Sequence, residues 1–410
     1  MTNASITNEL DRTNVLIMGK SGVGKSSLLN YMFGEEIQPV GTGAPVTKAE
    51  LNCFDYKYDE NFCIRIYDTW GLEPGADRAA AWKKTILEEV HRQDRKNIKD
   101  WFNTIIFCLS RNSDRVEDFE VDIIKGLVSE KNQVSIVITH CQSKDDEKAK
   151  TLRSAMISRL HDEGIDTIKE NDFVFVSNVQ RKLLTGSVEQ FGKEDVFAVI
   201  IHNVWNSFRV KVPYLAKQRL EEAYKKSHDE MMKDVERLNL FFNRTQNIHK
   251  FEERINERCR NFVIDISSDI NTMIIDAFNY YGALCRKYSV ISTGDIIENS
   301  INQIDFRYKA NSEIEKQIII DIEKLRKQVG IIDKLLENKN IENSFKSFLI
   351  DFKTSFADAK EIKKQVKSSL EAYMLNVYHC VRNSLDEVSE KIKSIDFDEF
   401  YQGQMKNVNY

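Results

Sequence analysis

A glycine-rich segment near the start of the chain has the residues of a phosphate-binding loop. Residues 15–30 read VLIMGKSGVGKSSLLN, which satisfies the pattern G-x-x-x-x-G-K-[ST]. An apolar run precedes the pattern and an apolar-periodic segment follows it, so a strand, a loop and a helix are expected in that order. Such a loop presents backbone N–H groups to phosphates at a helix N-terminus. The expected nucleotide contacts are Gly19, Lys20, Ser21, Gly22, Val23, Gly24, Lys25, Ser26 and Ser27.

Two positions of this loop carry specific chemistry. Lys25 should reach the β and γ phosphates of a nucleoside triphosphate, and the Ser26 hydroxyl should ligate Mg²⁺. An acid is then needed on the metal side, and the segment IRIYDTWG supplies Asp68 at a strand end. Gly71 follows, and its N–H could sense the γ phosphate. The sequence therefore predicts a triphosphate with magnesium.

The segment between these motifs, VGTGAPVTK, offers two hydroxyls that could complete the metal shell. They belong to Thr42 and Thr47. We favour Thr47, because it directly precedes the second expected strand.

The first half of the chain supplies the strands that must position these residues. Short apolar runs alternate with helical stretches, as in a buried and mostly parallel sheet. This alternation predicts a doubly wound α/β domain. The runs are Asn14–Met18, Leu51–Tyr56, Phe62–Tyr67, Thr104–Leu109, Val134–Thr139 and Phe173–Val176.

The second half has a different composition. No proline follows Pro213 and glycine becomes rare, which favours long helices. Apolar residues recur every three or four positions over residues 251–270 and 370–395, as in a helical bundle core. We predict a leader at residues 1–13, a nucleotide-binding domain at 14–210 and an all-α domain, bundle or extended hairpin, at 211–410.

Composition limits the function classes. The formal net charge of −5 argues against a large nucleic-acid surface, and no partner nucleic acid is expected. No apolar run is long enough to span a bilayer, and the first residues lack a signal-peptide core. Seven cysteines without CxxC pairing read as reduced thiols. A cytoplasmic protein is expected, with a peripheral membrane location left open.

The motifs resemble a known family. GKSGVGKSSLLN, PVT and DTWGLE look like the G domain of the translation-factor-related P-loop GTPases, especially the Era-like, septin and GIMAP/Toc branches. The resemblance covers residues 14 to about 208. It implies GTP and GDP as ligands with Mg²⁺, and two switch loops near residues 35–48 and 70–78. The helical half suggests a dynamin-like or immunity-related arrangement.

The base-reading segment departs from the family pattern [NT]KxD. The chain has Thr139, His140 and Gln142 at these positions, so a neutral amide replaces the acid that selects guanine. Toc receptors are similar, with a T-H-x-Q form that reads guanine, so the resemblance favours GTP and leaves ATP open. Ser177 and Asn178 stand where the family has S-A-K, whose backbone amides contact guanine.

The neighbouring residues Asp145 and Asp146 could replace the missing acid. A cap at the start of a helix is the favoured role for them.

The catalytic group for hydrolysis is not obvious. Leu72 occupies the position where small GTPases carry a water-orienting glutamine, and a leucine cannot hydrogen-bond water. Glu73, Arg78, a switch-loop carbonyl or a partner remain candidates beside Lys25, Thr47 and Gly71.

The resemblance implies slow intrinsic hydrolysis that pairing of G domains stimulates. Arg115 is the first candidate for a contact across such a pair, and Arg111 is nearby. An ordinary surface charge is the alternative role for both residues.

Three functions are compatible with these motifs and with the helical half of the chain. The favoured one is a GTP-hydrolysing switch whose helical half relays the nucleotide state to a partner, an oligomer or a membrane. The alternatives are a ribosome-assembly GTPase of Era type and a nucleotide-binding scaffold that does not hydrolyse.

Overall fold

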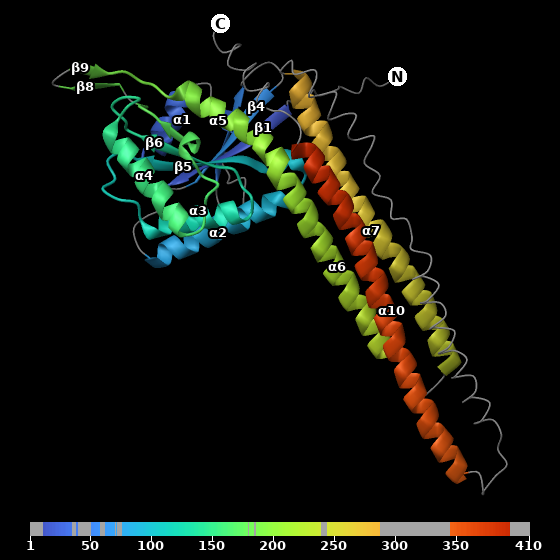
Figure 1. Cartoon of the computed structure of the whole chain (residues 1–410). Helices are drawn as coiled ribbons and strands as arrows, with labels where there is room; N and C mark the ends of the chain where they lie inside the picture. Colours follow the sequence, from blue (N-terminus) through green and yellow to red (C-terminus); the bar gives the residue numbers. More distant parts are fainter. Residues whose placement is uncertain are drawn as a thin grey trace, which may run out of the picture. The chain divides into compact units, whose positions relative to one another are not determined.

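The structure is a computed structural model of the chain (Figure 1). It describes residues 11–34, 38–39, 51–57, 62–69, 71, 76–178, 180–183, 186–238, 244–287 and 345–393. The chain forms two compact units. Unit 1 takes the described residues of Met1–Tyr214, Asp276–Asn299 and Ile392–Tyr410, and unit 2 takes those of Leu215–Ile275 and Ser300–Lys391.

Unit 1 is built on a sheet that has seven strands among the described residues. β1 lies between β4 and β5 and is parallel to both, and β6 and β7 continue the parallel order. β3 is antiparallel to β4, and β2 to β3. The order across the sheet is β2 (Gln38–Pro39), β3 (Asn52–Lys57), β4 (Phe62–Asp68), β1 (Asp11–Gly19), β5 (Phe102–Ser110), β6 (Val134–Thr139) and β7 (Phe173–Phe175).

Helices alternate with these strands, which confirms the predicted doubly wound α/β fold. The central strands β5 and β6 are buried along nearly their whole length, as expected for a sheet covered on both faces. The helices are α1 (Lys25–Phe33), α2 (Ala76–Asp94), α3 (Asp118–Ser129), α4 (Glu147–Asp162) and α5 (Lys193–Asn206). Short elements complete the unit: η2 (Ile98–Asp100), η3 (Glu170–Asp172) and the hairpin of β8 (Arg181–Leu183) and β9 (Gly186–Val188).

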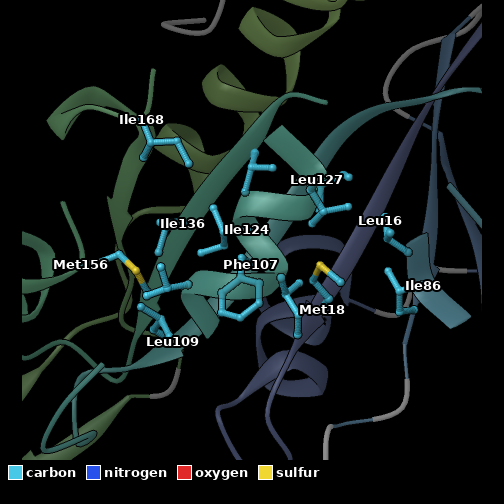
Figure 2. Close-up of a cluster of buried hydrophobic side chains, with 14 of the residues drawn as sticks. Leu16, Met18, Ile86, Phe107, Leu109, Ile124, Leu127, Ile136, Met156 and Ile168 are labelled. Atoms are coloured by element: carbon cyan, nitrogen blue, oxygen red, sulfur yellow. The ribbon is translucent and has the colours of Figure 1, made fainter. Parts of the chain in front are cut away.

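The core on one face of the sheet fixes the register of the phosphate-loop strand. Figure 2 shows Met18 of β1 beside Phe107 of β5, with Ile124 and Leu127 of α3 over them. All four side chains are fully or almost fully buried. Val15 and Ile17, which alternate with Leu16 and Met18 along the strand, are buried as well, so β1 is held on both faces up to the loop after Gly19.

One continuous helix leads out of unit 1. α5 passes through a π-helical turn, η4 (Ser207–Lys211), into α6 (Val212–Arg237). Pro213 lacks the N–H that a regular helix would use, and such turns occur where the hydrogen-bond ladder is interrupted. The boundary predicted between residues 210 and 211 lies inside this continuous helix, and the units divide after Tyr214.

The end of a helix from the second half of the chain belongs to unit 1. This helix is α7 (Arg244–Lys287). Tyr280 donates a hydrogen bond to the backbone carbonyl of Arg12 at 2.6 Å. The hydroxyl of Tyr281, which is fully buried, accepts one from Nδ2 of Asn103 at 3.3 Å. Residues 276–287, assigned from sequence to the helical domain, therefore complete the base of the nucleotide-binding unit.

Aromatic packing accounts for the burial of Tyr281. Its ring centroid lies 4.5 Å from that of Phe208 and 5.9 Å from that of Trp205. Nearby, Lys211 is fully buried and lies 2.6 Å from Asp94, so its charge is paired. Both clusters lie where α5 turns into α6.

Unit 2 consists of helices that lie side by side (Figure 1): α6 from Leu215, α7 up to Ile275, and α10 (Phe345–Lys393) up to Lys391. Arg219 of α6 contacts Asp269 of α7 at 3.3 Å, and Lys217 of α6 pairs with Asp386 of α10. The stripes predicted from sequence are buried where the structure describes them. They include Phe251, Ile255, Phe262, Ile270, Leu370, Met374, Val377, Val381, Leu385 and Val388.

The predicted stripe continues beyond what can be compared. Ile395 and the isoleucine- and leucine-rich segment at residues 316–336 lie outside the described residues. Among the described helices, none is long and apolar enough to cross a membrane.

Candidate functional site

The loop after β1 has the backbone that a phosphate cradle requires. Gly19, Gly22 and Gly24 have φ values of 144°, 79° and 92°, all in the region that favours glycine. A Cβ at Gly19 would lie 2.5 Å from the carbonyl oxygen of Cys108, so no other residue fits there. Gly24 is the N-cap of α1. The loop thus ends on a helix N-terminus, whose N–H groups and dipole favour an anion.

The side chain of Lys25, the first residue of α1, lies inside this loop. Its side chain is buried, and its Nζ donates to the carbonyls of Gly19 at 3.0 Å and Lys20 at 2.9 Å. Burial lowers the pKa of Lys25, and this effect is opposed by Cys108 and Asp68. The amine is therefore held at the position where a phosphate group would meet it.

Asp68 ends β4, directly beside Ile17 of β1 in the parallel register. Its Oδ1 is buried and has no hydrogen-bond partner among the described residues. Burial raises the pKa of Asp68 to about 6, against the opposing effect of Lys25. A buried carboxylate without partners is unfavourable, so this oxygen needs a cation or a donor.

The environment of Asp68 fits the expected magnesium site. The Oγ1 of Thr69 is also buried without a partner among the described residues. Ser26 is exposed in the first turn of α1. The described residues contain no group of three or more His, Cys, Asp and Glu that could hold a metal. A hard cation here would thus depend on Asp68, the Ser26 hydroxyl, water and phosphate oxygens.

Gly71 lies against the phosphate loop. A Cβ on this residue would be 2.5 Å from the Cα of Ser21 and 3.0 Å from the Nζ of Lys25. The segment after β4 is thus in contact with the loop that should hold phosphates.

The side chain of Lys20 is directed to α3. Its Nζ lies 2.6 Å from Glu117 and 3.3 Å from Glu120, and 4.9 Å from the ring centroid of Phe119. Glu117 caps α3 in a capping box with Glu120. Predicted as a nucleotide contact, Lys20 offers its backbone to the loop, while its side chain ties the loop to α3.

The base-reading segment meets the phosphate loop at the end of β6. The hydroxyl of Thr139 donates to the carbonyl of Val23 at 2.5 Å, with that of Leu109 also in reach at 3.1 Å. His140 has a φ of 63°. A Cβ at Gly24 would lie 3.0 Å from Nε2 of His140 and 3.3 Å from Nδ2 of Asn178. The structure thus brings together predicted residues from three loops.

Asp146 holds the backbone of this segment. It is the N-cap of α4, and its carboxylate accepts from the N–H of Gln142 at 2.8 Å and from those of Lys148 and Ala149. Arg111 also donates to it, at 2.9 Å. The predicted cap role of Asp146 is confirmed. Asp145, by contrast, has a side chain that is 90% exposed.

We expect Asp146→Ala to lower the free energy of unfolding by about 1–3 kcal/mol, because it leaves Arg111 and several N–H groups without their acceptor. Burial alone would raise the pKa of Asp146, but the N–H groups of Gln142 and Ala149 and the guanidinium of Arg111 together lower it. A lowered folded-state pKa adds stability above the unfolded-state pKa, and this is lost as the pH falls through the folded-state value. Urea denaturation should thus show a larger defect at pH 7 than at pH 3.

The matched control is Asp145→Ala, which removes a neighbouring exposed acid and should change stability by no more than about 0.5 kcal/mol. Equal effects of the two substitutions at pH 7 would contradict this assignment.

The remaining predicted residues are placed as follows. Arg78 and Arg115 are exposed, while Arg111 is largely buried against Asp146 and so is not an ordinary surface charge. Ser177 is buried, and its backbone exchanges hydrogen bonds with Phe191 at 3.1 Å. Outside the described residues lie Thr42, Thr47, Trp70, Leu72 and Glu73.

Sequence reasoning missed the partners of these residues. Glu117 and Glu120 bind Lys20, and Arg111 binds Asp146, yet no local pattern marks them because each pair joins distant segments.

An open hollow elsewhere in unit 1 contains none of the phosphate-loop residues. Arg153, Glu170, Phe175 and His202 are among the residues that line it.

Parts of this chain are similar to known proteins. Residues 14–140 match the family described as 50S ribosome-binding GTPase. This segment is similar to a P-loop GTPase domain. Cell division control protein 10 of Saccharomyces cerevisiae is 26% identical to this chain over 162 residues, which cover 32% of the chain and 50% of the yeast protein. The match thus spans half the length of that relative.

Two solved structures are similar to part of this chain. Toc33 of Arabidopsis thaliana, in complex with GDP and Mg²⁺, is 17% identical, with 48% of this chain and 85% of that chain covered and a TM-score of 0.32. Era of Aquifex aeolicus, bound to GDP and AlF4⁻, is 18% identical, with 47% and 57% covered and a TM-score of 0.31.

Proposed function

We propose that the G domain binds GTP with Mg²⁺ and hydrolyses it. The observation that carries this proposal is the buried, unpartnered Oδ1 of Asp68 in a site that also holds the amine of Lys25. This oxygen has no hydrogen-bond partner among the described residues, and it suits a cation. The family that matches residues 14–140 supports GTP as the nucleotide.

Different residues of the chain would bind the phosphates and the magnesium ion. Lys25 would leave the carbonyls of Gly19 and Lys20 and donate to the β and γ phosphates. Ser26 and Asp68 would hold Mg²⁺, with Thr47 as a further proposed ligand. When bound, the magnesium ion neutralises charge that develops on the phosphate oxygens. The N–H of Gly71 would report the γ phosphate.

For the base, we propose guanine. Thr139 and His140 lie against the end of the phosphate loop, and Asp146 fixes the backbone of Gln142.

We also propose that hydrolysis is slow until two G domains pair. Arg115 is exposed close to the start of α3, where it could reach a second copy.

We propose that the helices relay the nucleotide state to a partner, an oligomer or a membrane. The chain leaves unit 1 through α6, and the end of α7 is part of unit 1, so both helices have one end in the G domain's own unit. We also propose a cytoplasmic location, because the sequence has seven cysteines and no CxxC pair.

The test is steady-state GTP hydrolysis by the full chain across a hundredfold range of protein concentration, with Mg²⁺ and with EDTA. We expect the rate per molecule to rise roughly tenfold with concentration, since pairing supplies a group in trans. With EDTA the rate should fall to background. Arg115→Ala should flatten the concentration dependence and leave nucleotide binding unchanged.

Other results would point elsewhere. A flat rate per molecule would exclude stimulation by pairing. Tight GTP binding without turnover at any concentration would favour the non-hydrolysing scaffold, and turnover that rises only on addition of ribosomal subunits would favour the Era-type alternative.

A further inference from the structure

Guanine needs more hydrogen-bond acceptors than the base-reading segment supplies. Its Watson–Crick edge presents an N1–H and an N2 amine, and a carboxylate can accept from both. Gln142 has only one acceptor oxygen in its side chain. If the G domain binds GTP, as proposed above, an acceptor from another residue would restore the pair of bonds that a carboxylate makes.

Asn178 has an acceptor oxygen without a partner. Its side chain is 4% exposed, and Nδ2 donates to the carbonyl of Gly24 at 3.2 Å. Because a carbonyl can only accept, this contact fixes which end of the amide faces Gly24. Oδ1 is then directed elsewhere, buried and without a hydrogen-bond partner among the described residues. Such an orphaned oxygen is unfavourable unless a ligand satisfies it.

The position of Asn178 suits a base contact. The N–H of Cys141 donates to the carbonyl of Val176 at 3.0 Å, so the loops after β6 and β7 lie together. The side chains of Asn178 and His140 both approach the Cβ position of Gly24, so both lie beside the end of the phosphate loop. Asn178 therefore stands where the phosphate loop meets the base-reading segment.

We propose that Oδ1 of Asn178 accepts a hydrogen bond from guanine and serves, beside Gln142, as the second acceptor in place of the missing acid. The two amides share the task that one carboxylate performs in the common pattern. Oδ1 is shielded from water, so a neighbouring group has to move before the base contacts it. The bond then forms without competition from solvent.

The test is competition binding of GDP and ADP, both with Mg²⁺, to the full chain and three variants. The phosphates are identical in the two nucleotides, so the ratio of the two dissociation constants reports the base alone. Asn178→Leu keeps the volume and removes the acceptor. It should weaken GDP binding about tenfold and change ADP binding less than about twofold. Leu28 still donates to the Gly24 carbonyl in this variant.

Two further variants separate the acceptor from loop support. Asn178→Asp keeps an acceptor but loses the donor to Gly24, and it should retain the guanine preference. Gln190→Ala removes the 3.1 Å bond from Gln190 to the Asn178 carbonyl, which loosens the same loop, and it should leave the GDP-to-ADP ratio unchanged.

Three outcomes would overturn the proposal. Asn178→Leu could weaken GDP and ADP equally, Asn178→Asp could lose the guanine preference, or Gln190→Ala could reduce that preference as much as Asn178→Leu does. A wild-type chain that binds neither nucleotide would instead refute the proposed function itself.

Discussion

Asp68→Asn is expected to lower magnesium-dependent GTP hydrolysis by about a hundredfold or more, since a catalytic metal contributes several kcal/mol. The carboxylate oxygen that has no hydrogen-bond partner among the described residues would become part of a neutral amide. An amide holds a divalent cation less strongly, so the concentration of Mg²⁺ needed for half-maximal activity should rise as well. Hydrolysis measured over a magnesium titration gives both values.

Stability separates this role from a structural one. The nucleotide-free Asp68→Asn protein should melt at the same temperature as the wild type or higher, because a buried charge without a partner is removed. The control is Asp55→Asn on β3, whose carboxylate binds Arg65 at 2.6 Å and which should leave hydrolysis unchanged. A magnesium dependence that stays the same in Asp68→Asn would contradict the assignment.

Tyr281→Ala is expected to destabilise the G domain by about 3–5 kcal/mol, the range for removing a large aromatic side chain from a core. The ring is fully buried against Trp205 and Phe208, and its loss would leave a cavity under the base of the sheet. Urea denaturation followed by tryptophan fluorescence should report the change, because Trp205 lies beside the substituted ring.

Tyr281→Phe is the matched control. It keeps the ring but leaves Nδ2 of Asn103 without its acceptor, which should cost about 1–3 kcal/mol. The order of stability should therefore be wild type, then Tyr281→Phe, then Tyr281→Ala. If Tyr281→Ala changed the stability by less than about 1 kcal/mol, α7 would not be part of the folded G domain.

The sequence identifies features that depend on local pattern. The phosphate loop lies within eight residues between a strand and a helix, so Gly19 to Ser26 could be predicted together. Asp68 could be predicted because it ends an apolar run, and the end of a strand beside β1 is a fixed place. The fold class followed from the alternation of runs.

Features that join distant segments could not be predicted. Arg111 and Asp146 are 35 positions apart, and Asn103 and Tyr281 are 178 apart, so only the folded chain shows that they meet. The direction of a long side chain is equally hidden: Lys20 sits in the phosphate motif, yet its amine reaches the acids of α3. The stripe at residues 251–270 indicated a buried helix face but did not show that the same helix ends in unit 1.

The contribution of α7 to unit 1 sets an order of events during synthesis. Tyr281 leaves the ribosome 67 residues after Tyr214, the last residue of the first segment of unit 1. At roughly 5–20 residues per second, this delay is about 3–13 s. During that time the nascent G domain has its strands and phosphate loop but lacks the side chain that covers Trp205 and Phe208. Until α7 has been translated, the nascent domain therefore has aromatic surface exposed to solvent.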